Sequence, residues 1–229
     1  MKLGSNWRLA CACGGILAVG AVVVTAGPLA PPAGPVASTY KTLSEVEPRV
    51  AVQSLSGDSI VQNYITQPGS YYLTGKITGV SGKKGIAVLA SNVTIDLCGF
   101  SMEGAGVGDD AIFANSGISG LTVRNGIISD WVKEGVDGFY SNGCTLESLQ
   151  VRNSVAGYGL ITGTGSIIRN CAVSGSAVGI VTTPDCAVID CTAQGNTSGG
   201  FLLGSGSTAT RCAASASTTA PAPGFSCAD

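Results

Sequence analysis

The chain has 229 residues, a net charge of −2 and no histidine, and only 11% of its residues are charged. The absence of histidine excludes Ser-His-Asp and Cys-His catalysis and histidine-based zinc sites. The charge gives no electrostatic basis for binding nucleic acid or an anionic membrane surface, so neither is expected as a partner. The length allows about one domain after a removable leader.

Residues 1–26 are predicted to be a signal peptide. Lys2 and Arg8 supply a positive region, residues 16–24 an apolar segment, and Val24-Thr25-Ala26 a small-residue cleavage site. The apolar segment is short for a bilayer span, so no membrane span is expected after cleavage; a retained anchor is the alternative. We therefore expect a secreted or extracytoplasmic protein, in the periplasm or at the cell surface. Seven of its nine cysteines would remain, so at least one is unpaired within a monomer.

Residues 27–38 are rich in Pro, Ala and Gly and are predicted to be a linker. Residues 39–85 are predicted to form an N-terminal cap, with strand-like segments on both sides of a Gln-Pro-Gly-Ser turn at 67–70. Within this cap, residues 42–45 fit a capping box, and Pro48 ends the short helix or turn that follows. A cap is expected because the open end of a solenoid exposes unpaired backbone and bare core.

Residues 92–227 repeat about every 21 residues, which predicts that residues 86–229 form a β-solenoid whose coils stack on their neighbours. A Gly or Ala followed by an apolar residue marks each repeat, with steps of 27, 21, 20, 21 and 24 between the apolar members. These pairs are Ala111-Ile112, Gly138-Phe139, Gly159-Leu160, Gly179-Ile180, Gly200-Phe201 and Gly224-Phe225.

Aligning the coils produces files of equivalent residues, and alternation assigns each file to one face. One file is apolar and predicted to point inward: Ile95, Val123, Leu146, Ile168, Val188 and Ala209. The file one residue later is predicted to point outward and alternates in charge: Asp96, Arg124, Glu147 and Arg169. Neighbours in such a file lie ~4.8 Å apart, so opposite charges should attract by ~0.2–1 kcal/mol per pair and help to set the register.

A third file, also predicted to point inward, brings Cys171, Cys191 and Cys212 into consecutive coils. A metal or redox site is one interpretation, but a straight ladder offers no tetrahedral ligand set and no Cys-x-x-Cys pair is present. We favour the alternative, that these cysteines pack as small hydrophobic residues, and expect no metal and no cofactor. Spacing alone leaves a disulfide between adjacent coils open.

Two segments carry a resemblance to a known family: residues 65–75 (ITQPGSYYLTG) and 91–97 (SNVTIDL). With the later Gly-apolar coils, they resemble right-handed parallel β-helix proteins of the pectin-lyase-like group, especially exported bacterial proteins of unassigned function. The resemblance covers roughly residues 60–227. It implies an all-β fold, a single-stranded right-handed parallel β-helix, here of about six coils with an N-terminal cap. It also implies three sheets around a narrow core and an association with polysaccharide binding, lysis or hydrolysis.

The chain departs from the enzymes of that group. It has no Gly-His-Gly or Arg-Ile-Lys segment, and its acidic residues are scattered along the sequence. Asp109 and Asp110 could act as acid and base or hold calcium, but adjacent residues of an extended segment point to opposite faces. A solvated loop is therefore the favoured interpretation of this pair, and no catalytic residue is assigned.

The segment from Asp130 to Asp137 is the longest excursion in the repeat and is the first choice for a binding site. With Trp131, Tyr140 and Tyr158 beside it, it could form an aromatic platform with acids nearby that holds a sugar ring. The alternative is that Trp131 folds back over the edge of the core.

The leading hypothesis is an exported, non-catalytic protein that binds glycan or serves as a surface structural module, with polysaccharide as its partner. One alternative is a polysaccharide lyase or glycoside hydrolase acting on acidic polysaccharide. Another is a fibre or adhesin segment that trimerises. The small inward residues of the last coil also suggest a homo-oligomer formed through the C-terminal end, with a shortened chain or frayed end as the alternative.

Overall fold

The structure is a computed structural model that describes residues 49–154, 156–215 and 227–228. The predicted signal peptide, the linker, the capping box and the Gly224-Phe225 pair lie outside these residues. Within the described ranges, no helix is long and apolar enough to span a bilayer.

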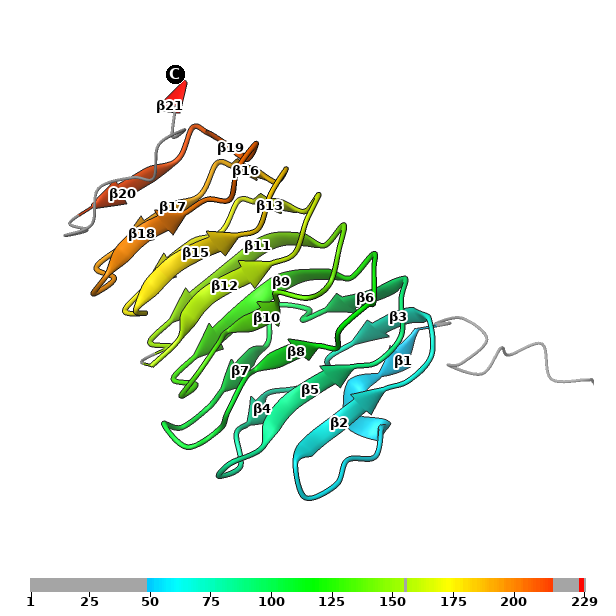
Figure 1. Cartoon of the computed structure of the whole chain (residues 1–229). Helices are drawn as coiled ribbons and strands as arrows, with labels where there is room; N and C mark the ends of the chain where they lie inside the picture. The colour runs from blue at the N-terminus through cyan, green and yellow to red at the C-terminus, as the bar shows by residue number, and fades with distance from the viewer. Residues whose placement is uncertain (1–48, 155, 216–226, 229) are drawn as a thin grey trace, which may run out of the picture. The chain divides into compact units, whose positions relative to one another are not determined.

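The described chain is an all-β parallel solenoid of about seven coils, built from a small and a large sheet (Figure 1). The small sheet has seven strands: β2 (Val61–Ile65), β5 (Lys84–Val88), β8 (Ile112–Ala114), β10 (Val136–Gly138), β12 (Tyr158–Thr162), β15 (Val178–Thr182) and β18 (Gly199–Leu202). A 3₁₀ turn, η1 (Val52–Ser54), precedes it.

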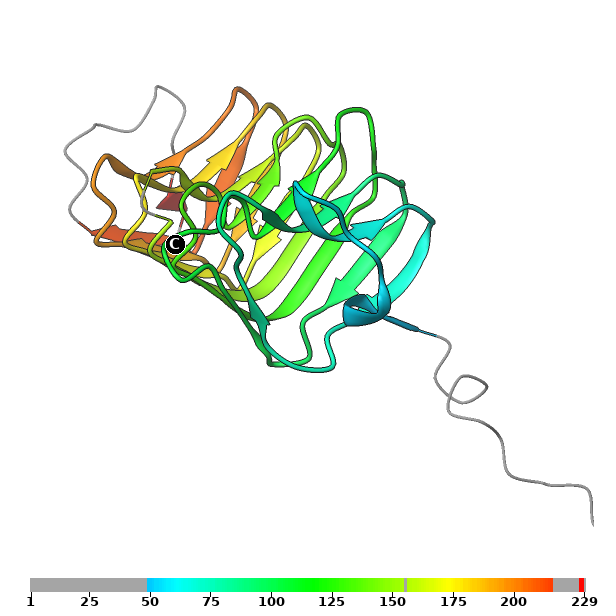
Figure 2. The same cartoon turned by 90° about the horizontal axis from the view of Figure 1, so that it is seen from below.

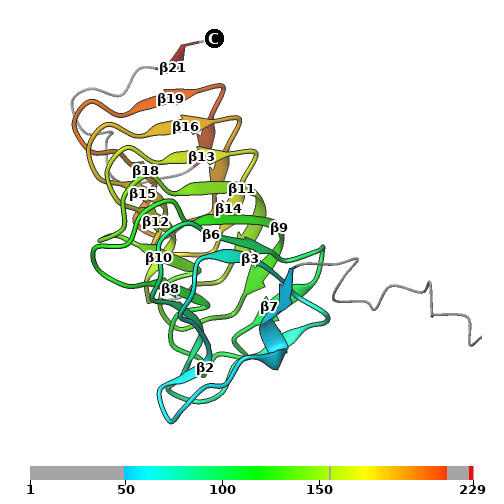
Figure 3. The same ribbon diagram turned by 90° about the vertical axis from the view of Figure 1, so that its right-hand side faces the viewer.

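The large sheet has fourteen strands in two branches, joined through the long strands β9 (Thr122–Ser129) and β11 (Thr145–Arg152). The first branch adds β1 (Val50–Ala51), β3 (Gly69–Tyr72), β6 (Val93–Asp96), β13 (Ile167–Arg169), β16 (Ala187–Ile189), β19 (Thr208–Thr210) and β21 (Cys227–Ala228). The second branch adds β4 (Ile77–Thr78), β7 (Ser101–Glu103), β14 (Ala172–Ser174), β17 (Thr192–Gln194) and β20 (Ala213–Ser215). Figures 2 and 3 show the successive coils from two further sides.

The predicted inward file is confirmed by the strand register of the first branch. Ile95 pairs with Val123, and the same file continues through Leu146, Ile168, Val188 and Ala209. None of these side chains is more than 3% exposed. The alternation of apolar and polar residues therefore fixes which face of each strand meets the core.

The number of coils is about seven instead of six. Strands β2 and β3 lie in the stretch 39–85 that was predicted to be a cap, yet they pair in parallel with β5 and β6 of the next coil. Part of that stretch is thus already solenoid.

The predicted repeat unit Gly138-Phe139 is wrong. Val136 pairs with Ile112 on one side and with Leu160 on the other, so the equivalent pair is Gly135-Val136 and both steps are 24 residues. The segment before Val136 is a loop longer than those of later coils. Phe139 follows the strand and is 39% exposed, so it lies at the surface.

A corner with left-handed backbone joins the two branches of the large sheet. The residues there have φ between 50° and 60°: Asn125, Ser148, Asn170, Asp190 and Arg211. Asn and Asp tolerate this conformation better than other residues with a side chain, because their short polar groups bond locally. The file of polar residues in the sequence therefore marks where each coil changes direction.

Ion pairs between neighbouring coils confirm part of the predicted charge file. Arg124 Nη2 lies 3.1 Å from Asp96 Oδ2, and Arg169 Nε donates to Glu147 Oε2 at 2.7 Å. At the corner, Arg211 pairs with Asp190 at 2.6 Å. These pairs are partly or largely exposed, so each contributes little stability and mainly favours the observed register.

Cys171 and Cys191 occupy one buried file, as the register of β14 and β17 requires, and are 2% and 0% exposed. Their thiols lie 3.2 Å from the carbonyl oxygens of Arg169 and Ile189, to which they donate. The hydrogen bond with Cys191, together with burial, raises the pKa of the Cys171 thiol. The geometry favours the interpretation that these cysteines pack as small hydrophobic residues with a weak donor.

Two adjacent isoleucines of β13 test which side chains of the strand point into the core. Ile168 is fully buried, whereas Ile167 is 41% exposed. Ile168→Ala should lower the free energy of unfolding by about 2–5 kcal/mol, because it removes buried surface and leaves a cavity. Ile167→Ala should change it by less than about 1 kcal/mol. Urea denaturation measures both, and equal losses would contradict the assignment of faces.

Candidate functional site

On the small sheet, two successive positions of each coil face inward. Ile86, Ile112, Val136 and Leu160 are fully buried. The residue before them is Gly or Ala, and a Cβ added to Gly85 or Gly135 would meet the core side chains Trp131 and Val151. Because the Gly or Ala and the apolar residue after it both face inward, the alternation is broken at this point. The residue directly before each Gly or Ala therefore points to the outer face. They form one file: Lys84, Asp110, Glu134 and Tyr158.

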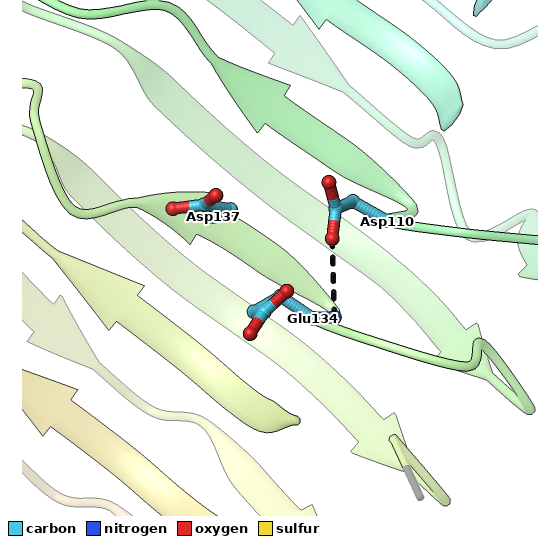
Figure 4. A group of neighbouring side chains, drawn as sticks. All are labelled: Asp110, Glu134 and Asp137. Carbon is cyan, nitrogen blue, oxygen red and sulfur yellow. Dashed lines mark hydrogen bonds between the residues drawn. The ribbon is translucent and has the colours of Figure 1, made fainter. Parts of the chain in front are cut away.

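Three carboxyl groups converge on that outer face. Asp110 and Glu134 come from neighbouring positions of the file, and Asp137 comes from strand β10. One oxygen from each lies within 4.8 Å of the others (Figure 4). Asp110 Oδ1 also accepts a hydrogen bond from the Glu134 backbone N–H at 3.3 Å. Residues separated by a loop of the sequence thus become one acidic cluster, named here the carboxyl cluster (Asp110, Glu134 and Asp137).

Two lysines border the carboxyl cluster. Lys84 Nζ contacts Asp110 Oδ2 and lies 3.3 Å from Asp109 Oδ2, while Lys133 Nζ lies 2.8 Å from Asp109 Oδ1. Lys84 Nζ also lies 4.3 Å from the centre of the Phe113 ring. The lysines offset part of the negative charge that four neighbouring acidic groups would otherwise concentrate here.

The interpretation of Asp109 and Asp110 as a solvated loop pair that cannot aim at one point is wrong. Asp110 is 1% exposed, and both carboxylates contact the same ammonium group of Lys84. Both residues precede strand β8 and hydrogen-bond to neighbouring coils through their backbones: Gly85 N–H donates to the Asp110 carbonyl, and Asp109 N–H donates to the Lys83 carbonyl, each at 2.9 Å. Strand alternation does not govern a pair that lies before the start of the strand.

Burial controls the protonation of the carboxyl cluster. It raises the pKa of Glu134 to about 8, with further contributions from the hydrogen bond to Asp110 and the charges of Asp110 and Asp137. Burial and the charge of Asp110 also raise the pKa of Asp137. At Asp109, burial is outweighed by the hydrogen bond from Lys133 and the charge of Lys84, so its pKa is lowered. The raised pKa favours the protonated form of Glu134, which can donate a hydrogen bond.

An open groove with a volume of about 420 Å³ runs beside the carboxyl cluster. Aromatic rings, apolar side chains and carboxyl groups line it: Glu134, Asp137, Phe139, Tyr140, Tyr158, Ile161, Val181 and Leu202. The rings of Phe139 and Tyr140 pack edge to face with centroids 4.7 Å apart. Tyr140 is 66% exposed, so its ring is available to a ligand.

Five of the seven residues predicted for the site are brought together, and two are not. Asp109, Asp110 and Asp137 gather around Lys84 and the cluster, and Asp137 shares the groove with Tyr140 and Tyr158. Asp130 lies in the loop and accepts a hydrogen bond from Asn153 Nδ2 at 2.9 Å. It does not line the groove.

The prediction that Trp131 forms part of an exposed aromatic platform is wrong. Its side chain is fully buried, and its Nε1–H donates to the Met102 carbonyl at 3.0 Å. A Cβ added to Gly85 or Gly108 would meet its ring. The glycines therefore leave the space that the indole fills, and the tryptophan closes the core instead of facing a ligand.

Glu134 and Lys84 were missed as site residues. The signal was present: each stands directly before a Gly-apolar pair, as Asp110 stands before Ala111-Ile112. Because the sequence alignment of the coils used Gly138-Phe139 as the repeat pair, Glu134 was not aligned with Asp110 and Tyr158.

The carboxyl cluster has the chemistry of a hydrogen-bonding site more than of a cation site. Carboxylate oxygens are the ligands that calcium prefers. Here Lys84 already contacts Asp110, so one of the three groups is engaged by a cation of the protein itself. A protonated carboxyl beside a second carboxyl group instead supplies a donor and acceptors to a polar ligand.

Comparison of the chain with family models, with curated proteins and with solved structures finds no match. The pectin-lyase-like type is therefore only a resemblance, carried by residues 65–75 and 91–97 with the later Gly-apolar coils, while the parallel solenoid is shown by the structure.

Stability should depend on pH through Glu134. Its pKa is about 8 in the folded chain, against an ordinary value of 4.5, so between these pH values the folded state binds more protons than the unfolded state. The free energy of unfolding should accordingly fall as pH rises from about 4.5 to about 8. Glu134→Gln, neutral at every pH, should remove most of this slope. Because the side chain is only half-buried, the gain at pH 8 should be about 1–2 kcal/mol.

Thermal or urea unfolding across pH 4 to 9 measures this slope. Glu147→Gln is the matched control, because Glu147 lies on the large sheet and pairs with Arg169 away from the cluster. It should keep the slope of the unmodified protein. A slope that survives Glu134→Gln would show that another group titrates.

Proposed function

We propose that the protein is an exported β-solenoid that binds glycan, without catalysis, in the groove on the outer face of the small sheet. The observation that carries this proposal is the meeting of exposed aromatic rings with the carboxyl groups of Glu134 and Asp137 in one open groove. Sugar rings present apolar C–H faces and polar edges, so their sites combine aromatic surfaces with a few placed polar groups.

The groove offers each of these elements at a separate place. Tyr140 and Tyr158 supply ring faces and hydroxyl groups, and Phe139 supports Tyr140. Glu134 offers a donor to a sugar hydroxyl, and Asp137 offers an acceptor. The apolar side chains of Ile161, Val181 and Leu202 supply the remaining surface. A solenoid groove of this kind suits an extended polymer, because successive coils repeat the same geometry.

Export is part of the same proposal. The positive region, apolar segment and small-residue site in residues 1–26 support it. A secreted or surface location would bring the groove into contact with extracellular polysaccharide.

Glycoside hydrolysis is the second candidate, and the spacing of two carboxyl groups favours it. Oxygens of Glu134 and Asp137 lie within 4.8 Å of each other, close to the ~5–5.5 Å separation of retaining glycosidases. Glu134, with its raised pKa, would be the acid and Asp137 the nucleophile. Binding without catalysis is preferred, because burial disfavours the ionised form of Asp137 that a nucleophile needs.

Binding should depend on the exposed aromatic residue of the groove. Tyr140→Ala should weaken the affinity for a retained polysaccharide about tenfold, the effect of losing one stacked ring. Phe100→Ala is the control, since Phe100 is also exposed, at 39%, but lies outside the groove. Affinity electrophoresis of the purified chain against plant and microbial polysaccharides provides the measurement.

The proposed site would be overturned if no polysaccharide retained the protein, or if Tyr140→Ala and Phe100→Ala lost affinity equally. The alternative outcome is that the protein releases new reducing ends from the polysaccharide. If Glu134→Gln abolished this release and left retention unchanged, the result would support glycoside hydrolysis over binding without catalysis.

A further inference from the structure

An amine and two carboxyl groups follow one another in the outer file of the small sheet. Lys84, Asp110 and Glu134 occupy equivalent positions of consecutive coils, since Gly85 N donates to the Asp110 carbonyl at 2.9 Å and Ala111 N donates to the Glu134 carbonyl at 3.0 Å. Neighbouring strands lie ~4.8 Å apart, so the three side chains stand side by side. The ladder thus brings a nucleophile, a carboxyl group and a second acid to one place.

The carboxyl group of Asp110 is held from both sides. Its Oδ2 contacts Lys84 Nζ, while its Oδ1 accepts from the Glu134 backbone N–H at 3.3 Å (Figure 4). The side chain of Asp110 is 2% exposed and that of Lys84 is 18% exposed. The centre of the Phe113 ring lies 4.3 Å from Lys84 Nζ and covers it further. An amine and a carboxyl group are therefore kept in contact with little access to water, which favours a reaction between them.

Glu134 supplies an acid next to this pair. Burial raises the pKa of Glu134 to about 8, and its hydrogen bond with Asp110 contributes to the rise. A carboxyl group with such a pKa can both give and take a proton near neutral pH. The backbone N–H of Glu134, which already bonds to Asp110 Oδ1, can also stabilise negative charge that develops on that oxygen.

The neighbouring ion pair lacks these features. Lys133 Nζ lies 2.8 Å from Asp109 Oδ1, but the two side chains are 55% and 22% exposed. The hydrogen bond from Lys133 and the charge of Lys84 outweigh the burial of Asp109 and lower its pKa. A carboxylate held in its ionised form resists attack by an amine. Asp109 is therefore the poorer partner for Lys84, although its Oδ2 lies 3.3 Å from Lys84 Nζ.

We propose that Lys84 and Asp110 condense in the folded chain to an intramolecular isopeptide bond, with Glu134 as the proton carrier. The bond joins Lys84 Nζ to Asp110 Cγ. It links two neighbouring coils and closes a loop between residues that are 26 positions apart. Such a cross-link restricts the unfolded chain as a disulfide does, but it is not broken by reduction.

The atoms of this step balance without an oxidant or a reductant. Burial lowers the pKa of Lys84, but the hydrogen bond and charge of Asp110 outweigh it and raise that pKa, so the two groups rest as an ion pair. Lys84 Nζ first passes one proton to Asp110 Oδ2, which leaves a neutral amine and a neutral carboxyl group. Nζ then attacks Cγ while Oδ1 carries the negative charge. Glu134 donates its proton to Oδ2, the Cγ–Oδ2 bond breaks, one water molecule leaves, and Glu134 takes the remaining proton from Nζ.

Mass spectrometry of the denatured full chain tests the bond. The unmodified protein should weigh one water molecule less than the sequence of the same chain. A tandem spectrum of its digest should contain a branched peptide that joins Lys84 to Asp110. Lys84→Arg keeps the positive charge but lacks the primary amine, so this variant should keep its full mass. Lys133→Arg is the matched control, because Lys133 pairs with Asp109 in the same region, and it should still lose water.

Glu134→Gln tests the proton carrier. It keeps the backbone N–H that contacts Asp110 but cannot exchange a proton, so it should slow formation of the bond at least about hundredfold. A time course of the mass after cell-free synthesis gives the rate. Circular dichroism shows whether each variant is folded.

Several results would overturn the proposal. One is a folded, unmodified chain of full mass, and another is a branched peptide at Asp109. A third is a loss of water that persists in Lys84→Arg, which would place it elsewhere, such as a cyclic imide at Asp137-Gly138. An unchanged rate in Glu134→Gln would contradict the assigned role of Glu134. The inference goes beyond glycan binding and does not rest on it, because none of these measurements involves a polysaccharide.

Discussion

The stacking of like side chains along the solenoid is the interaction on which the rest of the structure depends. Each inward residue packs on the residue at the same position of the next coil, so the apolar file from Ile95 to Ala209 is continuous and almost fully buried. A shift of one residue in any strand would turn its apolar set to solvent. The core therefore selects one register, and the partly exposed ion pairs only reinforce it.

Close packing inside the narrow core explains which residues of the small sheet point to its outer face. Gly85, Gly135 and Gly159 leave no room for a Cβ, because core side chains or backbone of the next coil already lie where it would go. The inward step at these glycines turns the preceding residues outward. The carboxyl cluster is therefore a consequence of how the narrow core is packed. Its burial against neighbouring coils then favours the protonated form of Glu134.

Another corner shows how polar groups are satisfied between coils. The backbone N–H groups of Cys144 and Cys186 donate to Ser166 Oγ and Ser207 Oγ of the next coil, each at 3.0 Å. Ser166 N in turn lies 3.4 Å from Cys186 Sγ. The alternation of Cys and Ser in this buried file thus serves hydrogen bonding as well as packing, since buried donors need partners.

The sequence by itself determined the class of fold, the inward files of the large sheet and the polar corner, because these follow from a period of two within strands and a repeat between coils. It did not reveal the carboxyl cluster, and it left the burial of Trp131 as one of two interpretations. The loop before Val136 obscured the repeat, and the break in alternation at Gly135 cannot be read from periodicity. Only the tertiary structure decided which acidic groups meet, because their distance depends on the register of coils that lie some 24 residues apart.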